Sequence, residues 1–360
     1  MKKQLFAFLI WMLFTSNAMA SVISLHGEGT VGYVSDGRNL PRGGGLDTIS
    51  GFVINSSEAP SLFNDSLFFT ADFVGDTKFY TEVQLNGVSG NLLFNEVNVS
   101  YADFKFGRFR VPFGYYVPRS VYSSWNKFQR RDLISGPTPG SATAIMTGGF
   151  LPGYETGLMF SGAIESFGYN VYAVHGNGSN ALAATTGTTP GSVKDNLSYG
   201  FQMTYDFTQA IQAGFSYYAN SDDKVGGKNS IASNIFGKAN FDAVNVSIEY
   251  MNILLPVGYN NNTLFGTFLS SSTVVETILP VLILEGSYDF SKSFMVAVRC
   301  FSITKTGLGF SNQGRSAVQL GAEYQLNDQL TVGADYTFRN NEGTELTEDN
   351  SITVTTQFKF

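Results

Sequence analysis

The chain has 360 residues, of which 14% are charged, against about 25% in a typical soluble domain, while Phe occurs 32 times and Gly 39 times. The mean hydropathy of +0.01 argues against a helical membrane protein, because such a protein needs apolar runs of about 20 residues. The aromatic content argues against disorder, and the net charge of -7 argues against a nucleic-acid partner. The class that fits this composition is an all-β protein whose outer face contacts lipid.

Residues 1–20 have the features of a signal peptide. Lys2 and Lys3 precede an apolar core from Leu5 to Phe14, and Ala18-Met19-Ala20 forms a cleavage site of the small-x-small type. The apolar core is too short to span a bilayer, which disfavours the alternatives of a membrane anchor or a buried helix. We therefore expect the mature chain to start at Ser21 and to form one domain over 21–360.

Apolar and polar residues alternate with a period of two along the mature chain, which predicts strands with one apolar and one polar face. The clearest case is 351–360, which has the length of a tilted transmembrane strand. The pattern predicts sixteen strands, near 22–34, 65–74, 78–87, 94–101, 104–112, 154–163, 168–175, 197–206, 211–221, 234–240, 244–252, 276–289, 294–302, 316–325, 329–339 and 351–360. The segments near 168–175 and 234–240 alternate poorly, so 14 or 18 strands are also compatible with the sequence.

The connections between these strands alternate in length. Short links such as 75–77, 102–103 and 290–293 alternate with long ones such as 35–64, 113–153 and 176–196. Lipid offers no hydrogen-bond partners, so every strand edge must be paired. The sequence therefore predicts a closed antiparallel transmembrane β-barrel of about 16 strands, with short periplasmic turns and long extracellular loops. A barrel of this size has a lumen wide enough for water.

Two short segments resemble a known family. The last strand ends in Phe358 and Phe360 and is similar to the C-terminal membrane-insertion signal of Gram-negative outer-membrane proteins. The segment 106–114, with the sequence FGRFRVPFG, resembles a strand-end motif of the phosphate-selective O/P-like porins and related porin families. This resemblance implies an outer-membrane location, passive diffusion of small hydrophilic solutes and a homotrimer. It also implies contact with outer-membrane lipid, lipopolysaccharide and the barrel-assembly machinery.

A basic block lies between Asp103 and Asp132, where no acidic residue occurs. It contains Lys105, Arg108, Arg110, Arg119, Lys127, Arg130 and Arg131. On the predicted strand, Phe109 and Val111 suit the lipid face, so Arg108 and Arg110 are expected to point into the lumen. The remaining members lie in the long connection 113–153, which in porins folds into the barrel, and a loop of this length calls for a functional explanation. The block, without Lys105, is our candidate pore constriction, and fixed positive charge there would favour anions. The alternative is an external loop that is solvated or binds lipopolysaccharide phosphates.

Acidic residues also occupy predicted lumen positions. The candidate acidic wall comprises Asp72, Glu82, Glu96, Glu249, Glu323 and Asp335. Facing acidic and basic walls would produce a transverse field across the lumen, and the net ion selectivity could then have either sign.

The sequence therefore predicts a water-filled porin, with no enzymatic activity, cofactor or metal site. Asp222-Asp223 lacks the ordered spacing of a calcium loop. An outer-membrane hydrolase is a less favoured alternative, because only His26 and His175 could act as the base, and Ser179 lies too near His175 in sequence for a typical triad. A further alternative is a non-conducting adhesin or structural barrel. The apolar run from Ile278 to Leu284 is either a contact with a neighbouring protomer or an ordinary lipid-facing stretch, and Cys300 falls on the apolar face.

Overall fold

The computed structural model describes residues 22–36, 64–73, 76–86, 92–114, 154–175, 197–222, 228–255, 277–305, 313–341 and 351–359. Within these ranges the chain forms sixteen β-strands. Their bounds are β1 Val22–Asp36, β2 Asn64–Asp72, β3 Thr77–Asn86, β4 Leu92–Tyr101, β5 Phe104–Arg110, β6 Tyr154–Ile164, β7 Phe167–His175, β8 Leu197–Asp206, β9 Ile211–Asp222, β10 Lys228–Phe241, β11 Val244–Leu255, β12 Thr277–Ser291, β13 Phe294–Lys305, β14 Gln313–Asn327, β15 Leu330–Asn341 and β16 Ser351–Lys359. In the same ranges no helix is long and apolar enough to span a membrane.

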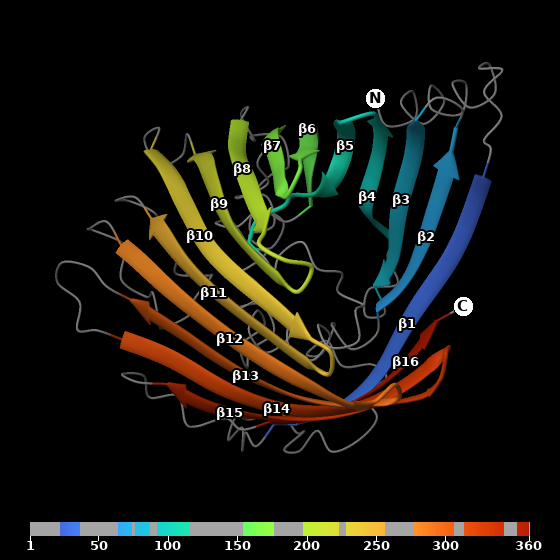
Figure 1. Ribbon diagram of the computed structural model, residues 1–360, viewed down its shortest axis with the longest axis vertical. Helices are drawn as coiled ribbons and strands as arrows, with labels where there is room; N and C mark the ends of the chain where they lie inside the picture. The colour runs from blue at the N-terminus through green and yellow to red at the C-terminus, as the bar shows by residue number, and fades with distance from the viewer. Residues whose placement is uncertain are drawn as a thin grey trace, which may run out of the picture.

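The strands form one antiparallel sheet that curves around a central space (Figure 1). Each strand pairs with the next in sequence, and β1 also pairs with β16, so the sheet is closed. The all-β antiparallel fold predicted from the alternation is confirmed. Both ends of the described chain lie at the end of the barrel that carries the short turns. Val22 pairs with Asp72 and Phe358 pairs with Leu330, and each of these partners lies beside a short turn.

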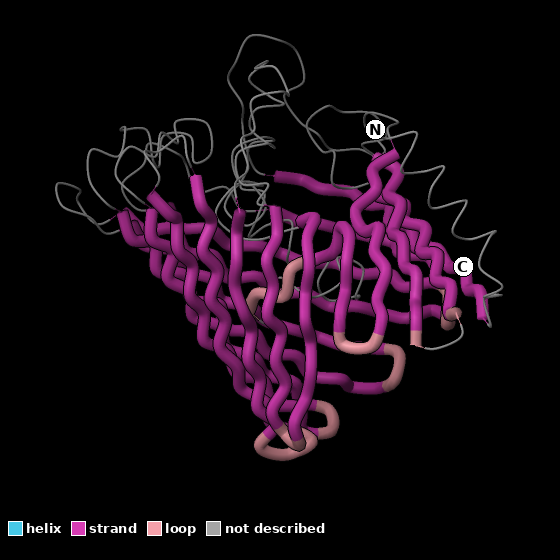
Figure 2. The backbone as a smooth tube through the Cα atoms, turned by 90° about the horizontal axis from the view of Figure 1, so that it is seen from above, coloured by secondary structure: helices cyan, strands magenta, loops and turns pink. Residues whose placement is uncertain are grey.

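Short turns join the strands at one end of the sheet, and long connections join them at the other (Figure 2). Five of the short connections are two-residue turns, for example 102–103 and 242–243. In both of these turns one residue, Ala102 or Asp242, adopts a φ of 47°, the left-handed conformation that tight hairpin turns require. The alternation of connection lengths therefore follows the sequence prediction.

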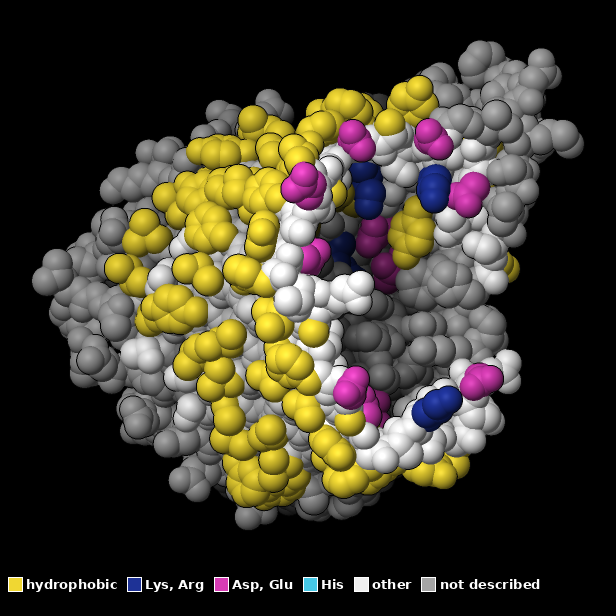
Figure 3. Space-filling view, viewed as in Figure 1, with side chains coloured by type: hydrophobic (Ala, Val, Ile, Leu, Met, Phe, Trp, Pro, Cys, Tyr) yellow, Lys and Arg dark blue, Asp and Glu magenta, His cyan; other side chains and the backbone are white. Residues whose placement is uncertain are grey.

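Apolar side chains cover the outside of the sheet, and polar side chains are buried on its inside. Large hydrophobic residues on most strands are exposed, such as Phe106, Val171 and Ile235. Buried polar residues include Glu82, Glu155, Ser198, Gln202, Ser216, Asn234, Ser247, Glu249, Arg299, Gln319, Glu323 and Asp335. Figure 3 shows the apolar side chains over the outer wall, and charged side chains around and within a hollow. This partition is the reverse of that in a water-soluble domain.

Two irregular segments of the sequence pattern have structural explanations. Along β10 the inward positions carry a polar residue, Asn234, and an aromatic one, Phe236, and both are buried. The run 278–284 is apolar on both faces, because Leu279, Val281 and Ile283 are buried on the inside whereas Ile278 and Leu284 are exposed outside. The description of this run as an ordinary lipid-facing stretch is therefore wrong for its inward half.

Candidate functional site

The chain enters the lumen where β5 ends. Val111 and Phe113 are fully buried, and Gly114 lies against the inner side of β8 and β9. The backbone N–H of Gly114 donates a hydrogen bond of 2.9 Å to Ser216 Oγ, and Gln202 Nε2 donates one of 2.7 Å to the Gly114 carbonyl oxygen. In Figure 2 a short loop segment lies inside the sheet, away from both rows of connections. The beginning of the long connection after β5 is thus fixed to the inner wall.

Gly114 occupies a site that strongly favours glycine. Its φ is +65°, and a Cβ built there would lie 1.9 Å from Glu249 Oε1. The carboxylate is itself fixed, because Asn234 Nδ2 donates a 2.6 Å hydrogen bond to the same oxygen. We call Gly114, Gln202, Ser216, Asn234 and Glu249 the Gly114 latch. It joins the segment after β5 to four strands, β8 to β11.

Of the six acidic residues predicted to line the lumen, four are buried and two are half-buried, and their role as an acidic wall stays a prediction. Glu82, Glu249, Glu323 and Asp335 are 2–7% exposed, and Asp72 and Glu96 are half-buried. Glu82 and Glu96 lie directly opposite each other on β3 and β4, so their side chains share one face of the sheet. On the wall formed by β14 and β15, Gln319 Nε2 donates a 3.0 Å hydrogen bond to Asp335 Oδ1.

Two described members of the basic block lie close to one residue of this acidic wall, Glu96. Arg110 and Lys105 are within electrostatic range of the Glu96 carboxylate, which also accepts a hydrogen bond from the backbone N–H of Arg110. The remaining predicted constriction residues, Arg119, Lys127, Arg130 and Arg131, lie outside the described residues. Phe360 of the predicted membrane-insertion signal also lies outside the described residues, and Phe358 is described only by its backbone pairing.

The prediction that Phe109 and Val111 contact lipid is wrong. Both are fully buried, and Phe109 lies opposite the buried Glu155 of β6. Apolar residues are needed inside here because the chain turns into the lumen directly after the strand. Arg108 lies opposite Thr156, an exposed residue, and follows Gly107, whose φ of +115° interrupts the regular strand geometry. The lumenal orientation of Arg108 and Arg110, which we derived from the lipid-facing assignment, stays a prediction.

Further polar contacts strengthen the inner wall. The Tyr218 hydroxyl on β9 donates a 3.0 Å hydrogen bond to Glu155 Oε1 on β6, spanning two intervening strands. Arg299 on β13 forms a buried ion pair with Glu285 on β12. Gly114, Gln202, Ser216 and Asn234 were not predicted from the sequence as site residues. The one signal available was Pro112-Phe113-Gly114 at the end of a strand, since a Gly at such a position indicates a special backbone conformation.

The residues considered for catalysis or metal binding are described only in part. His175 is exposed at the end of β7, and Ser179 lies outside the described residues. No group of three or more His, Cys, Asp or Glu residues with the geometry of a metal site occurs within the described ranges.

Comparison with known proteins identifies the fold. No protein-family model and no curated protein sequence matches the chain significantly. Among solved structures, OmpF of Salmonella typhi in complex with daunomycin is similar with a TM-score of 0.62 at 12% identity, with 94% of this chain and 97% of that chain covered. The anion-selective porin of Comamonas acidovorans has a TM-score of 0.61 at 12% identity, with 94% and 99% covered. OmpT, an outer-membrane protein of Vibrio cholerae in a trimer form, has a TM-score of 0.57 at 11% identity, with 94% of this chain and 100% of that chain covered.

The chain has a porin fold. At these identities the similarity is one of fold alone. Within this porin fold, the Gly114 latch lies on the inner wall and the exposed apolar side chains lie on the outer wall.

Proposed function

We propose that the protein is a porin of the Gram-negative outer membrane. In this proposal, the closed sheet of sixteen strands forms a water-filled channel for passive diffusion of small hydrophilic solutes. The observation that carries the proposal is the reversed partition of side chains, with exposed Phe, Val and Ile outside and buried Glu, Gln, Ser and Arg inside. Such a surface is stable only where lipid surrounds the wall and polar groups face an enclosed interior.

The connection 113–153 is proposed to narrow this channel. Support comes from its first residues, because the Gly114 latch directs the chain across the interior toward β8 to β11. A segment that continues from this point inside the lumen would reduce the cross-section open to solutes.

The basic block is proposed to give the channel a preference for anions. The acids Glu82, Glu249, Glu323 and Asp335 are 2–7% exposed, so a solute would contact them very little. Arg110 is half-buried, as are the acids Asp72 and Glu96, and it lies within electrostatic range of Glu96. Fixed positive charge that a solute can reach lowers the entry barrier for anions. One of the structures with a similar fold is from a porin described as anion-selective.

Assembly as a homotrimer is part of the proposal, supported by the trimer form of one structure with this fold. The proposed surroundings are outer-membrane lipid and lipopolysaccharide, and the proposed assembly route uses the barrel-assembly machinery acting on the C-terminal strand with Phe358 and Phe360.

Planar-bilayer recording of the purified protein tests the channel proposal. Stepwise conductance increments are expected as single molecules insert. Silence from protein shown to be inserted and folded would overturn the proposal and favour a non-conducting barrel, and lipolytic or proteolytic turnover would favour a hydrolase.

The reversal potential under asymmetric KCl tests the anion preference. We expect a reversal potential of the sign given by anion permeation, and a shift toward cation permeation in Arg110→Ala. Lys292→Ala is the matched control, because Lys292 is exposed in the turn between β12 and β13, away from the Gly114 latch. If Arg110→Ala and Arg108→Ala both leave the reversal potential unchanged, the described part of the basic block does not control selectivity.

A further inference from the structure

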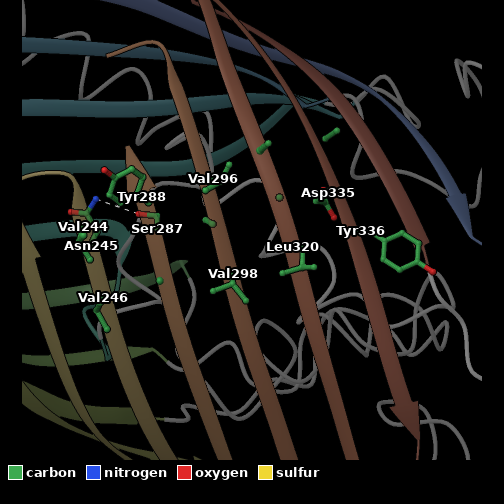
Figure 4. A pocket seen from close by; sticks show the side chains of 15 residues that line it. Val244, Asn245, Val246, Ser287, Tyr288, Val296, Val298, Leu320, Asp335 and Tyr336 are labelled. Carbon is green, nitrogen blue, oxygen red and sulfur yellow. Dashed lines mark hydrogen bonds between the residues drawn. The ribbon is translucent and has the colours of Figure 1, made fainter. Parts of the chain in front are cut away.

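A groove of about 780 Å³ crosses the outer face of the sheet over β11 to β15. Its floor is formed by small residues that share the outward face, Gly286, Ala322 and Ala334. Ala322 lies opposite Ala334 and Val296, so two alanines and a valine stand side by side on three strands. Figure 4 shows the larger lining side chains, among them Val298 and Leu320, on neighbouring strands. The outer face is thus hollowed here, whereas large apolar side chains cover most of the rest of it.

The dimensions of the groove match the depth of one lipid leaflet. Five strands with a spacing of about 4.8 Å give a length of about 19 Å across the sheet. Strands of outer-membrane barrels are tilted by about 35–45°, so this length spans roughly 11–14 Å along the membrane normal. Half of the hydrocarbon core, which is about 30 Å thick, is close to this depth. The groove can therefore accommodate a single extended hydrocarbon chain within one leaflet.

One edge of the groove is bordered by aromatic rings near the short turns. The ring of Tyr288 contacts that of Phe290 at 4.7 Å, Phe290 stands 5.6 Å from Phe294, and Phe294 stands 6.5 Å from Tyr324. Aromatic belts of this kind mark the level of the lipid headgroups. Lys292 is exposed in the turn between Phe290 and Phe294, where its ammonium group can reach an anionic headgroup. The occupant of the groove thus has its polar end on the short-turn side.

We propose that the groove binds an acyl chain of a phospholipid from the leaflet on the short-turn side, with the phosphate of that lipid beside Lys292. This inference rests on the membrane location proposed above. An acyl chain that lies over Gly286, Ala322 and Ala334 fills a space that freely exchanging bilayer lipids would pack poorly. Each carbon–carbon contact that it makes with the groove contributes dispersion energy. The position of the aromatic border favours this leaflet over the one at the long connections, where lipopolysaccharide would lie.

The test measures how much phospholipid the protein retains. Wild type, Ala334→Leu and Ala173→Leu are purified, reconstituted with synthetic phosphatidylethanolamine, extracted into mild detergent and analysed by native mass spectrometry. Ala173→Leu is the matched control, since Ala173 is also exposed on the outer face but lies on β7, outside the groove. We expect wild type and Ala173→Leu to retain phospholipid equally. Ala334→Leu is expected to retain at least about fivefold less, the lower end of the usual effect of overfilling a packed site.

Four results would overturn the proposal. Equal retention by all three proteins, or retention by none, would show that the groove binds no lipid chain. Retention of added lipopolysaccharide in place of phosphatidylethanolamine would assign the groove to the other leaflet. Cross-linking of two chains through Cys300, which is exposed on the outer face next to the groove, would assign it to a second copy. Flotation with vesicles is measured in parallel, because failure to float would refute the membrane location itself.

Discussion

Substituting Gly114 by alanine is the sharpest test of the Gly114 latch. A Cβ at this position would lie 1.9 Å from Glu249 Oε1, and the oxygen is held in place by Asn234. The residue would also keep a φ of +65°, which costs an L-residue about 1–2 kcal/mol.

If the segment leaves its site to escape this clash, the two hydrogen bonds with Ser216 and Gln202 are lost, each worth about 1 kcal/mol. A segment that stays docked keeps these bonds and bears the backbone cost instead, so the docking free energy falls by at least about 1–2 kcal/mol. Since each 1.4 kcal/mol changes an equilibrium tenfold, the docking equilibrium constant should fall at least about 5- to 30-fold. The barrel itself should stay folded, because none of the strand pairs depends on this contact.

The assay is single-channel conductance in a planar bilayer, together with the temperature at which the folded band disappears on a gel. We expect a higher mean conductance and more current noise for Gly114→Ala, with little change in that temperature. Gly237→Ala is the control, because a Cβ at this position on β10 would meet only ordinary contacts, 3.6 Å from Ile248 Cγ2. Identical conductance for the two variants would refute the conclusion that the latch positions the long connection.

Three further predictions concern the wall and its assembly. Arg299→Ala should lower the free energy of unfolding by about 3–5 kcal/mol, because it leaves the buried Glu285 carboxylate without its ion-pair partner, whereas the double change Arg299→Met with Glu285→Met should cost much less in urea titration. Phe109→Ala should lower the free energy of unfolding by about 3–5 kcal/mol in the same titration. Phe106→Ala on the same strand should lower it far less, because the Phe106 side chain is 54% exposed. Equal losses in the two variants would contradict the inward placement of Phe109. Phe360→Ala should reduce the amount of folded protein in the outer-membrane fraction, measured by the gel shift of unheated samples, and an unchanged yield would argue against the C-terminal insertion signal.

The strands could be predicted because a period of two in side-chain character is a direct consequence of strand geometry. Segments such as 351–360, with apolar residues on one face only, gave strand positions within a few residues of those observed. The pattern weakens where the interior itself is apolar. Tyr172 and Val174 on β7 and Phe236 on β10 are buried inside, so apolar residues there fall on both faces.

The candidate site was predicted only in part. Acidic positions such as Glu82, Glu249 and Asp335 could be placed on the inner wall because the alternation of their own strands determines the face. Phe109 was assigned to the wrong environment because its apolar character suits both lipid and the buried base of an inserted segment. The contacts of Gly114 with Gln202 and Ser216 join residues far apart in sequence, and no local pattern indicates such a pairing.

The separation in sequence within the Gly114 latch has a consequence for the order of folding. Gly114 precedes Gln202 by 88 residues and Ser216 by 102, and its site is complete only when β8 to β11 are aligned. Contacts between distant residues form late, because the entropy of closing the intervening chain must be overcome first. The segment after β5 must therefore wait until much of the wall has been built. A folding intermediate of the protein would thus have a wider lumen than the native barrel, because the segment after β5 would not yet narrow it.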